Sequence, residues 1–259
     1  MKEQLNIIKV GGKIVEEESS LAALLRDFAA LPGRKVLVHG GGRSATAMAS
    51  RLGIETRMVD GRRVTDEAML EVVTMVYAGL VNKRVVARLG ALGVKALGLT
   101  GADMDVIRSH RRTGTQVDYG FVGDVDRVNA DALRLLIEDG TVPVVAPLTH
   151  DGQGQLLNTN ADTMAGETAK ALACHYDVTL TFCFEKRGVL LDSSDDDSVI
   201  PRITAAGFAQ LKADGTVQGG MLPKLENSFA ALRAGVKRVV ITRADLLGQE
   251  GQGTVIELN

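Results

Sequence analysis

The sequence predicts an α/β fold: a three-layer α/β/α sandwich with a central, mostly parallel sheet, arranged in two lobes. Short apolar runs rich in β-branched residues alternate with segments of helical periodicity, as in proteins whose parallel strands are covered on both faces. The second observation is an excess of glycine, 29 among 259 residues, against an average share of about 7%. These glycines cluster where the apolar runs end, so they mark turns beside buried strands and not a flexible linker.

The expected elements alternate along the chain. Strands are predicted from short, mostly apolar runs at residues 5–10, 34–40, 94–100, 141–148, 178–184, 236–242 and 254–258. Helices are predicted from apolar spacing at residues 19–30, 44–51, 66–91, 130–138, 158–173, 204–212 and 223–234. Asp60-Gly61 is typical of a hairpin turn, and residues 101–126 of strand ribbons. A new series of strands begins near residue 177, which suggests an N-terminal lobe of residues 1–176 and a C-terminal lobe of residues 177–259.

Composition and charge exclude several classes of protein. Lysine plus arginine is 30 and aspartate plus glutamate is 32, so the net charge of −2 lacks the basic excess of a nucleic-acid or membrane-surface binder. We find no apolar run of about 18 residues and no secretion signal. Cys174 and Cys183 stand in apolar surroundings and are expected to be small core residues. The expectation is a cytoplasmic protein with no nucleic-acid or membrane partner. The acidic run 192–197 favours an exposed hairpin tip over a metal site.

Two glycine-rich loops follow two buried strands, Lys9-Val-Gly-Gly12 and His39-Gly-Gly-Gly42. Glycine permits close approach of the backbone, and free N–H groups at a helix start hold anions. Ligands of open α/β sheets bind at the carboxyl ends of the strands, so this pair of loops predicts an anion site. Gly40, Gly42 and Ala45 also match a loose dinucleotide fingerprint, but Asp60 lies in a turn and not at the end of a second strand. The sequence contains no P-loop.

Three further polar segments stand out. In Asn158-Thr-Asn160-Ala-Asp162, Asn160 is typical of a helix N-cap, but this does not explain Asn158. In Gly219-Gly-Met-Leu-Pro-Lys224, a lysine at a helix start opposes the helix dipole, so a negative group should lie near it. In Gly61-Arg-Arg63-Val-Thr65, an arginine near a glycine loop is suited to bind a carboxylate through two hydrogen bonds.

The order of IIKVGG, VHGGG, DGRRVT, NTNADT and GGMLPK resembles the amino-acid kinase family over residues 5 to 234. Within that family, the GxRVT and NxNAD elements are similar to those of the branch that phosphorylates N-acylglutamates. The resemblance implies transfer of a phosphoryl group from ATP, with Mg²⁺, to the side-chain carboxylate of an N-acylglutamate in arginine biosynthesis. N-acetylglutamate is the default substrate. The acyl amino acid would bind to the N-terminal lobe and the nucleotide to the C-terminal lobe.

The resemblance also implies residue roles. Lys9 and Lys224 would stabilise the transferring phosphoryl group, and Asp162 would hold these two lysines. Four residues would bind the acyl amino acid: Gly41, Gly42, Arg63 and Asn158. Five would bind nucleotide or phosphate: Gly11, Gly12, Glu185, Gly219 and Met221. No metal-ligating residue is assigned, and His39 is interpreted as a positioning residue. Glu185 departs from the family, whose members usually carry an aspartate there.

Four alternatives stay open at this stage. The acyl group could be succinyl instead of acetyl, or the acceptor could be free glutamate or aspartate, as in other branches of the fold. A non-catalytic amino-acid sensor is disfavoured because Lys9, Asp162 and Lys224 occur together. A nicotinamide enzyme is disfavoured further by the poor fingerprint. The apolar stretch 66–91 suggests a homodimer, and the short segment before the first strand suggests that arginine does not inhibit through the N-terminal helix of the inhibited members.

Overall fold

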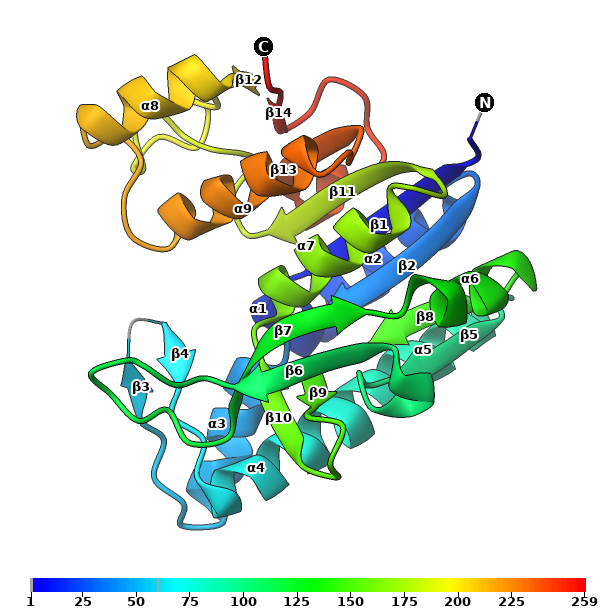
Figure 1. Ribbon diagram of the computed structural model, residues 1–259. Helices are drawn as coiled ribbons and strands as arrows, with labels where there is room; N and C mark the ends of the chain where they lie inside the picture. Colours follow the sequence, from blue (N-terminus) through cyan, green and yellow to red (C-terminus); the bar gives the residue numbers. More distant parts are fainter. Residues whose placement is uncertain (1, 60) are drawn as a thin grey trace.

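The computed structural model describes residues 2–59 and 61–259, and a twisted, mostly parallel sheet lies at its centre (Figure 1). Within these residues the sheet order is β12-β14-β13-β11-β1-β2-β8-β5. The strands are β1 (Gln4–Val10), β2 (Arg34–His39), β5 (Ala96–Leu99), β8 (Val142–Val145), β11 (Asp177–Phe184), β12 (Arg202–Ile203), β13 (Arg238–Arg243) and β14 (Thr254–Ile256). Strands β13 and β14 pair antiparallel, and the other neighbours pair parallel. The predicted fold class is confirmed.

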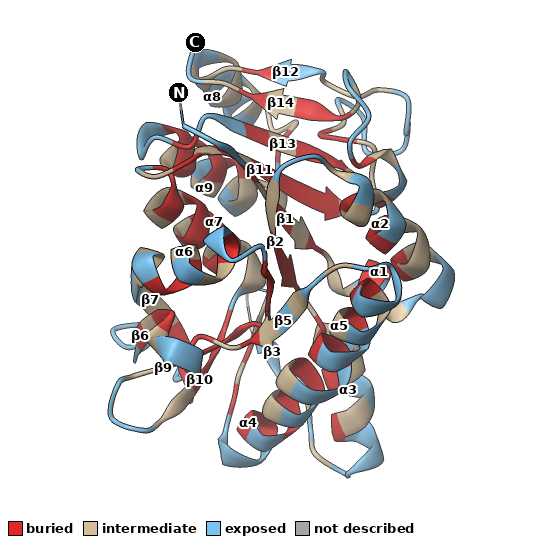
Figure 2. Ribbon diagram, turned by 90° about the vertical axis from the view of Figure 1, so that its right-hand side faces the viewer, coloured by how far each residue is buried: buried red, intermediate tan, exposed pale blue. Residues whose placement is uncertain are grey.

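Helices cover both faces of this sheet, and the buried strands run between them (Figure 2). One face carries α6 (Ala130–Glu138), α7 (Ala161–Leu172) and α9 (Met221–Arg233), with α8 (Ala205–Ala213) packed on α9. The other carries α1 (Gly12–Glu16), α2 (Glu18–Ala30), α3 (Gly42–Arg51) and α5 (Asn82–Ala91). A hydrophobic core lies on each face of the sheet, and side chains of β1 point alternately into the two. Leu5 and Ile7 belong to one core, and Ile8 and Val10 belong to the other.

The helix expected over residues 66–91 is confirmed, but its middle is π-helical. It consists of α4 (Glu67–Val73), the π-helix η1 (Thr74–Val81) and α5. Val76, Tyr77 and Val81 of η1 are buried, whereas Met75 and Leu80 are 54% and 45% exposed. π-Helical turns often occur at functional sites, and this one faces the glycine loops described below.

A small closed barrel of strands extends the N-terminal half. It contains β6 (Ile107–Arg111), β7 (Val122–Val128), β9 (Leu148–His150) and β10 (Leu156–Thr159), which confirms the strand ribbons expected near residues 101–126. The hairpin expected at residues 60–61 is formed by β3 (Met58–Val59) and β4 (Arg62–Arg63), with Asp60 itself outside the described residues.

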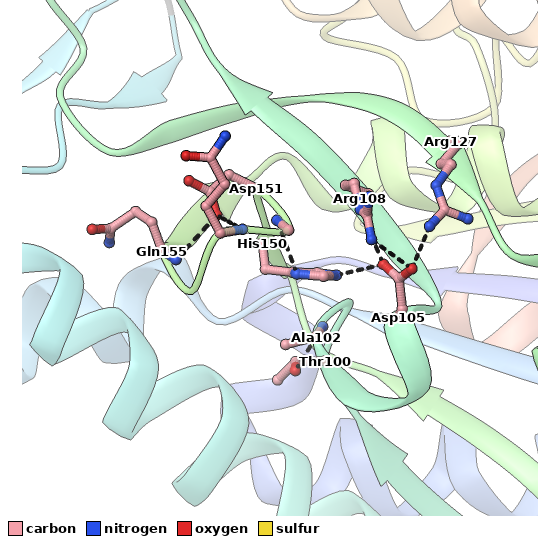
Figure 3. Close-up of polar contacts among 10 residues, drawn as sticks. Thr100, Ala102, Asp105, Arg108, Arg127, His150, Asp151 and Gln155 are labelled. Atoms are coloured by element: carbon pink, nitrogen blue, oxygen red, sulfur yellow. Dashed lines mark hydrogen bonds and ion pairs between the residues drawn. The ribbon is translucent and has the colours of Figure 1, made fainter.

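One carboxylate ties this barrel to the turn η2 (Asp103–Asp105), as Figure 3 shows. Asp105 accepts hydrogen bonds from Arg108 Nη2 at 2.8 Å, from His150 Nε2 at 2.8 Å, and from Arg127. Both oxygens of Asp105 are therefore engaged, and the cluster joins η2, β6, β7 and β9. We interpret it as a structural clamp.

Several details differ from the sequence-based expectations. The strand expected at 141–148 is broken after Val145, because Pro147 has no N–H to continue the ladder, and β9 begins at Leu148. The helix expected from residue 158 begins only at Ala161, after β10. Cys183 is buried as expected, but the prediction for Cys174 is wrong: this residue follows α7 and is exposed. The acidic run near Asp195 is exposed, as expected for a hairpin tip.

Candidate active site

The two glycine loops pack against each other at the carboxyl ends of β1 and β2. Gly40 N donates to Val10 O at 3.0 Å, and Gly11 N donates to Cys183 O at 3.1 Å. A Cβ atom on Gly40 would lie 3.1 Å from Gly12 N, and one on Gly12 would lie 3.5 Å from both Gly41 N and Gly42 N. The loops thus meet backbone to backbone, and a side chain at Gly40 would force them apart. Helix α1 begins at Gly12 and α3 at Gly42, so their first amides gather here, as the sequence predicted.

A carboxylate already binds the start of α3. Glu16 Oε1 accepts hydrogen bonds from Ser44 N at 2.5 Å and from Ser44 Oγ at 3.1 Å. This contact joins α1 to α3 and fixes the relative position of the two loops. It also shows that the amides of this helix start are directed toward anionic oxygen.

Asp162 holds two lysines from distant parts of the chain. Lys9 Nζ lies 2.7 Å from Asp162 Oδ1, and Lys224 Nζ lies 2.9 Å from Asp162 Oδ2. Lys9 comes from the end of β1, Asp162 from the first turn of α7 and Lys224 from the first turn of α9. The lysine side chains are 12% and 11% exposed. The structure therefore brings together the three residues to which the sequence assigned a catalytic role.

The charges in this cluster do not balance. Burial works to raise the pKa of Asp162, but the charges of Lys9 and Lys224 and their hydrogen bonds outweigh it and hold that pKa well below its ordinary value. Burial lowers the pKa of Lys224, and so does the charge of Lys9, while Asp162 opposes both. Two ammonium groups share one carboxylate, so a positive charge is left over beside the glycine loops. An anionic ligand such as a phosphate would neutralise it.

A cavity of about 180 Å³ lies next to the second glycine loop. All four residues assigned to the acyl amino acid line it: Gly41, Gly42, Arg63 and Asn158. Arg63 is 7% exposed, and its Nη2 donates to Gly42 O at 2.7 Å and to Thr46 Oγ1 at 2.8 Å. The guanidinium thus braces the loop while it faces the cavity, an arrangement suited to a ligand carboxylate.

Asn158 lines this cavity and is held in place by Thr65. Its Nδ2 donates to Thr65 Oγ1 at 2.9 Å, and Thr65 Oγ1 in turn donates to Arg63 O at 2.9 Å. This pair of bonds explains why Asn158 is present in addition to the N-cap residue Asn160, whose side chain accepts from Thr163 N at 3.0 Å.

Two further residues that line the same cavity had no role predicted from the sequence. Arg62 precedes Arg63 in β4, and Tyr77 lies in the π-helix. Nothing in the sequence marks Tyr77, because it stands in an apolar helical run. Its ring packs on the second loop, since a Cβ atom on Gly41 would lie 2.9 Å from Tyr77 Cδ1.

The residues assigned to the nucleotide do not all lie together. A second cavity, of about 490 Å³, lies between the segment after β11 and the start of α9, and Met221 lines it. Gly219 stands beside it with φ of +54°, a conformation that favours glycine. Glu185 lies elsewhere: its carboxylate contacts Lys13 Nζ at 3.0 Å and Arg43 at 3.6 Å, near the glycine loops. Gly11 and Gly12 belong to the loop cradle itself.

Comparisons with known proteins show the family to which this chain belongs. Residues 4–243 match the model of the amino acid kinase family. The chain is 66% identical over 257 residues to an acetylglutamate kinase of Bacteroides thetaiotaomicron, covering 99% of this chain and 100% of that protein. It is 43% identical over 256 residues to an acetylglutamate kinase of Methanopyrus kandleri, covering 97% and 100%.

Solved structures share the fold at lower identity. An N-acetylglutamate synthase of Neisseria gonorrhoeae superposes with a TM-score of 0.84 at 22% identity, over 98% of this chain and 59% of that one. A carbamate kinase of Giardia lamblia superposes with a TM-score of 0.73 at 13% identity, over 100% and 99%. Within the described residues, no helix is both long and apolar enough to cross a bilayer. By sequence and by fold, the chain belongs to the amino acid kinase family.

Proposed function

We propose that this protein transfers a phosphoryl group from ATP to the side-chain carboxylate of N-acetyl-L-glutamate, a step of arginine biosynthesis. The observation that carries the proposal is the position of Lys9, Asp162 and Lys224 beside two glycine loops and a cavity lined by Arg63 and Asn158. Full-length relatives named acetylglutamate kinase at up to 66% identity support the choice of substrate.

The chemistry needs no general base. A glutamate side-chain carboxylate has a pKa of about 4.3 and is already ionised at neutral pH. One of its oxygens attacks the γ-phosphorus, the bond from that phosphorus to the β–γ bridging oxygen breaks, and ADP leaves with the electron pair. No proton has to move. Burial lowers the pKa of His39 to about 4, so its ring is a weak base, and both of its nitrogens are already engaged by Gly40 O and Asn82 Nδ2. His39 is therefore not assigned as a general base.

The protein must instead overcome repulsion between two anions. A carboxylate about 4 Å from a phosphoryl oxygen meets roughly 4 kcal/mol per charge pair at an effective dielectric near 20. Lys9 and Lys224 supply positive charge on the transferring group, and Asp162 keeps both side chains in place. The amides of Gly12, Gly41 and Gly42 add fixed donors that need no reorganisation during the reaction.

A magnesium ion would arrive with the nucleotide. Both oxygens of Asp162 are engaged by lysines, so this carboxylate is not a ready metal ligand. Mg²⁺ keeps several waters and binds through substrate phosphates in many kinases, and this mode fits the residues present. The ion would neutralise phosphate charge, while the chain itself orients the phosphates through its lysines and glycine amides.

The two lobes divide the substrates in this proposal. Residues 1–176 hold the acyl amino acid, with Arg63 and Asn158 on its α-carboxylate end. Residues 177–259 hold ATP, with Met221 and Gly219 at the cavity after β11. Gly11 and Gly12 of the N-terminal lobe face the phosphates of the nucleotide. Glu185 would contribute to nucleotide binding indirectly, by holding the side chains of Lys13 and Arg43, because its carboxylate contacts both. Approach of the lobes would exclude water and align the reactants.

We also propose a homodimer formed through the π-helix. Met75 and Leu80 expose apolar side chains on its outer face, which a second copy would cover. A dimeric mass by light scattering at micromolar concentration supports this, and a monomeric mass contradicts it. A cytoplasmic location stays a prediction that cell fractionation tests.

The function is tested by trapping the acyl phosphate with hydroxylamine in the presence of ATP and Mg²⁺. The panel contains N-acetylglutamate, N-succinylglutamate, glutamate and aspartate. Product with N-acetylglutamate supports the proposal, and product with N-succinylglutamate alone would change the acyl group. Product with a free amino acid alone would move the protein to another branch of the fold. ATP binding without any product would favour an amino-acid sensor.

A further inference from the structure

We propose that His39 and Asn82 are positioning residues, which orient the Gly40–Gly41 peptide so that the Gly41 N–H is directed into the phosphoryl-binding cradle. The inference rests on the proposed function, which gives the cradle its role. Neither side chain touches a substrate in this account. Both act through the backbone of the second glycine loop.

His39 is fully buried at the end of β2 and makes one hydrogen bond with each ring nitrogen. Its Nδ1 lies 2.8 Å from Gly40 O, and its Nε2 lies 3.1 Å from Asn82 Nδ2. Asn82 is 1% exposed and is the first residue of α5, directly after the π-helix. The imidazole therefore bridges the glycine loop and the long helix.

The surroundings of Asn82 determine which nitrogen of His39 carries the proton. Asn82 Nδ2 lies 2.9 Å from Val144 O, which can only accept, and Asn82 Oδ1 accepts from Lys83 Nζ at 3.2 Å. The amide is thus oriented from two sides, and its nitrogen donates to His39 Nε2. Since Nε2 accepts, the proton of the neutral ring is on Nδ1, which donates to Gly40 O.

Because His39 holds the direction of the Gly40 carbonyl, it also determines the direction of the Gly41 N–H in the same peptide. The Gly40–Gly41 peptide is trans and planar, so its N–H points away from its C=O. His39 holds the carbonyl on one side, and the N–H is directed to the other side, where Gly12 lies. A Cβ atom on Gly12 would lie 3.5 Å from Gly41 N, which places this amide at the junction of the two loops.

The π-helix holds the same peptide by packing. A Cβ atom on Gly41 would lie 2.9 Å from Tyr77 Cδ1 and 3.5 Å from Val81 Cγ2. Tyr77, Val81 and Asn82 thus support the loop from one helical segment, two by contact and one through His39. In a regular α-helix these three residues would point in different directions relative to one another. The π-helical turns are therefore what allows all three to support the glycine loop.

The hydrogen bond is present throughout the neutral range. Burial and, to a smaller extent, the charge of Lys83 lower the pKa of His39, the bond to Gly40 opposes them, and the result is a pKa of about 4. The ring is neutral near pH 7, in the tautomer that the geometry requires.

Two substitutions separate positioning from simple packing. The side-chain nitrogen of asparagine can take the place of histidine Nδ1 as a donor, whereas the side-chain oxygen of glutamine can take the place of Nε2 as an acceptor. His39→Asn keeps a donor for Gly40 O and loses the link to Asn82. His39→Gln keeps the link and loses the donor. The matched control is His175→Gln, a half-buried histidine after α7.

We expect kcat of His39→Gln to fall by about 30-fold or more, with KM for both substrates within a few-fold, because one preorganised donor is misdirected. We expect His39→Asn to keep kcat within about five-fold although its thermal stability also falls. Equal loss of kcat in both variants, or full kcat in His39→Gln, would overturn the proposal.

A spectroscopic test needs neither a variant nor turnover. The chain has four histidines, so the ring nitrogens can be assigned by ¹⁵N NMR of the wild-type protein. We expect a neutral His39 ring protonated on Nδ1 at pH 7. A proton on Nε2 would overturn the inference even if the kinase activity is present. Failure of the kinase assay with the Nδ1 tautomer observed would instead reject the proposed function.

Discussion

Lys224 Nζ lies 2.9 Å from Asp162 Oδ2, and this ion pair joins the first turn of α9 to the first turn of α7. A lysine at a helix start opposes the helix dipole, so the sequence predicted a negative group near it. Asp162 is that group, and its other oxygen holds Lys9 at 2.7 Å. The pair thus explains an unfavourable residue placement and positions two cations for an anionic ligand.

Lys224→Ala is expected to lower kcat by orders of magnitude while leaving the affinity for both substrates within a few-fold. The reason is that its charge is needed most when charge spreads over the transferring phosphoryl group. Steady-state kinetics with separate binding measurements test this. Lys237→Ala is the control, because Lys237 is exposed and pairs only with Asp177 among the ion pairs described here. Near-normal turnover of Lys224→Ala would mean that another cation acts on the phosphoryl group.

Arg63→Ala is expected to raise KM for the acyl amino acid by about 10- to 100-fold, since a hydrogen bond between charged groups is worth roughly 1.5–3 kcal/mol. KM for ATP should change much less. Because Arg63 Nη2 also donates to Gly42 O, we expect a smaller decrease in kcat as well. Arg63→Lys should recover only part of the loss, since lysine lacks the planar fork. An unchanged KM in Arg63→Ala would remove Arg63 from the substrate site.

His39 makes stability depend on pH. Its pKa is lowered from 6.5 to about 4 in the folded protein, so between these values the unfolded chain binds more protons than the native one. The stabilising contribution is complete above pH 6.5 and is lost as pH falls toward 4, by about 3 kcal/mol in total. Chemical denaturation at several pH values should show a steeper acid decline in wild type than in His39→Gln. Parallel curves would contradict the buried neutral state.

Gly98→Ala tests the positioning network from a distance. A Cβ atom on Gly98 would lie 1.8 Å from Asn82 Oδ1, so the new methyl group must displace the amide that holds His39. We expect kcat to fall about ten-fold with the tautomer of His39 no longer fixed. Gly90→Ala in α5 is the matched control, because nothing lies within 4 Å of its added Cβ atom. If both variants keep wild-type kcat, Asn82 does not act through the loop.

Much of the fold was predictable because it depends on local patterns. Buried parallel strands such as 5–10 and 178–184 are continuous apolar runs, and glycine marks their carboxyl ends. The prediction for Cys174 was wrong because apolar neighbours in sequence do not determine burial just after a helix ends. The break at Pro147 was missed because the flanking strands β8 and β9 read as one run.

The residues of the candidate site could be predicted where they lie in short sequence motifs. The assignments of Lys9, Asp162 and Lys224 came from separate motifs, and the fold brings the Nζ atom of each lysine within 3 Å of an Asp162 oxygen. Tyr77 and Asn82 could not be found this way, because their role depends on a π-helical turn and on packing against glycines far away in sequence. The contacts of Glu185 with Lys13 and Arg43 likewise depend on how α1 and α3 pack.

The central claim is direct phosphoryl transfer to a carboxylate, and one ³¹P NMR experiment tests it most directly. The enzyme is mixed with ATP, Mg²⁺ and N-acetylglutamate whose side-chain carboxylate carries ¹⁸O. We expect an acyl-phosphate resonance with the isotope shift of a bridging ¹⁸O, formed together with ADP. An acyl phosphate without that shift, or release of inorganic phosphate with no acyl phosphate, would contradict it.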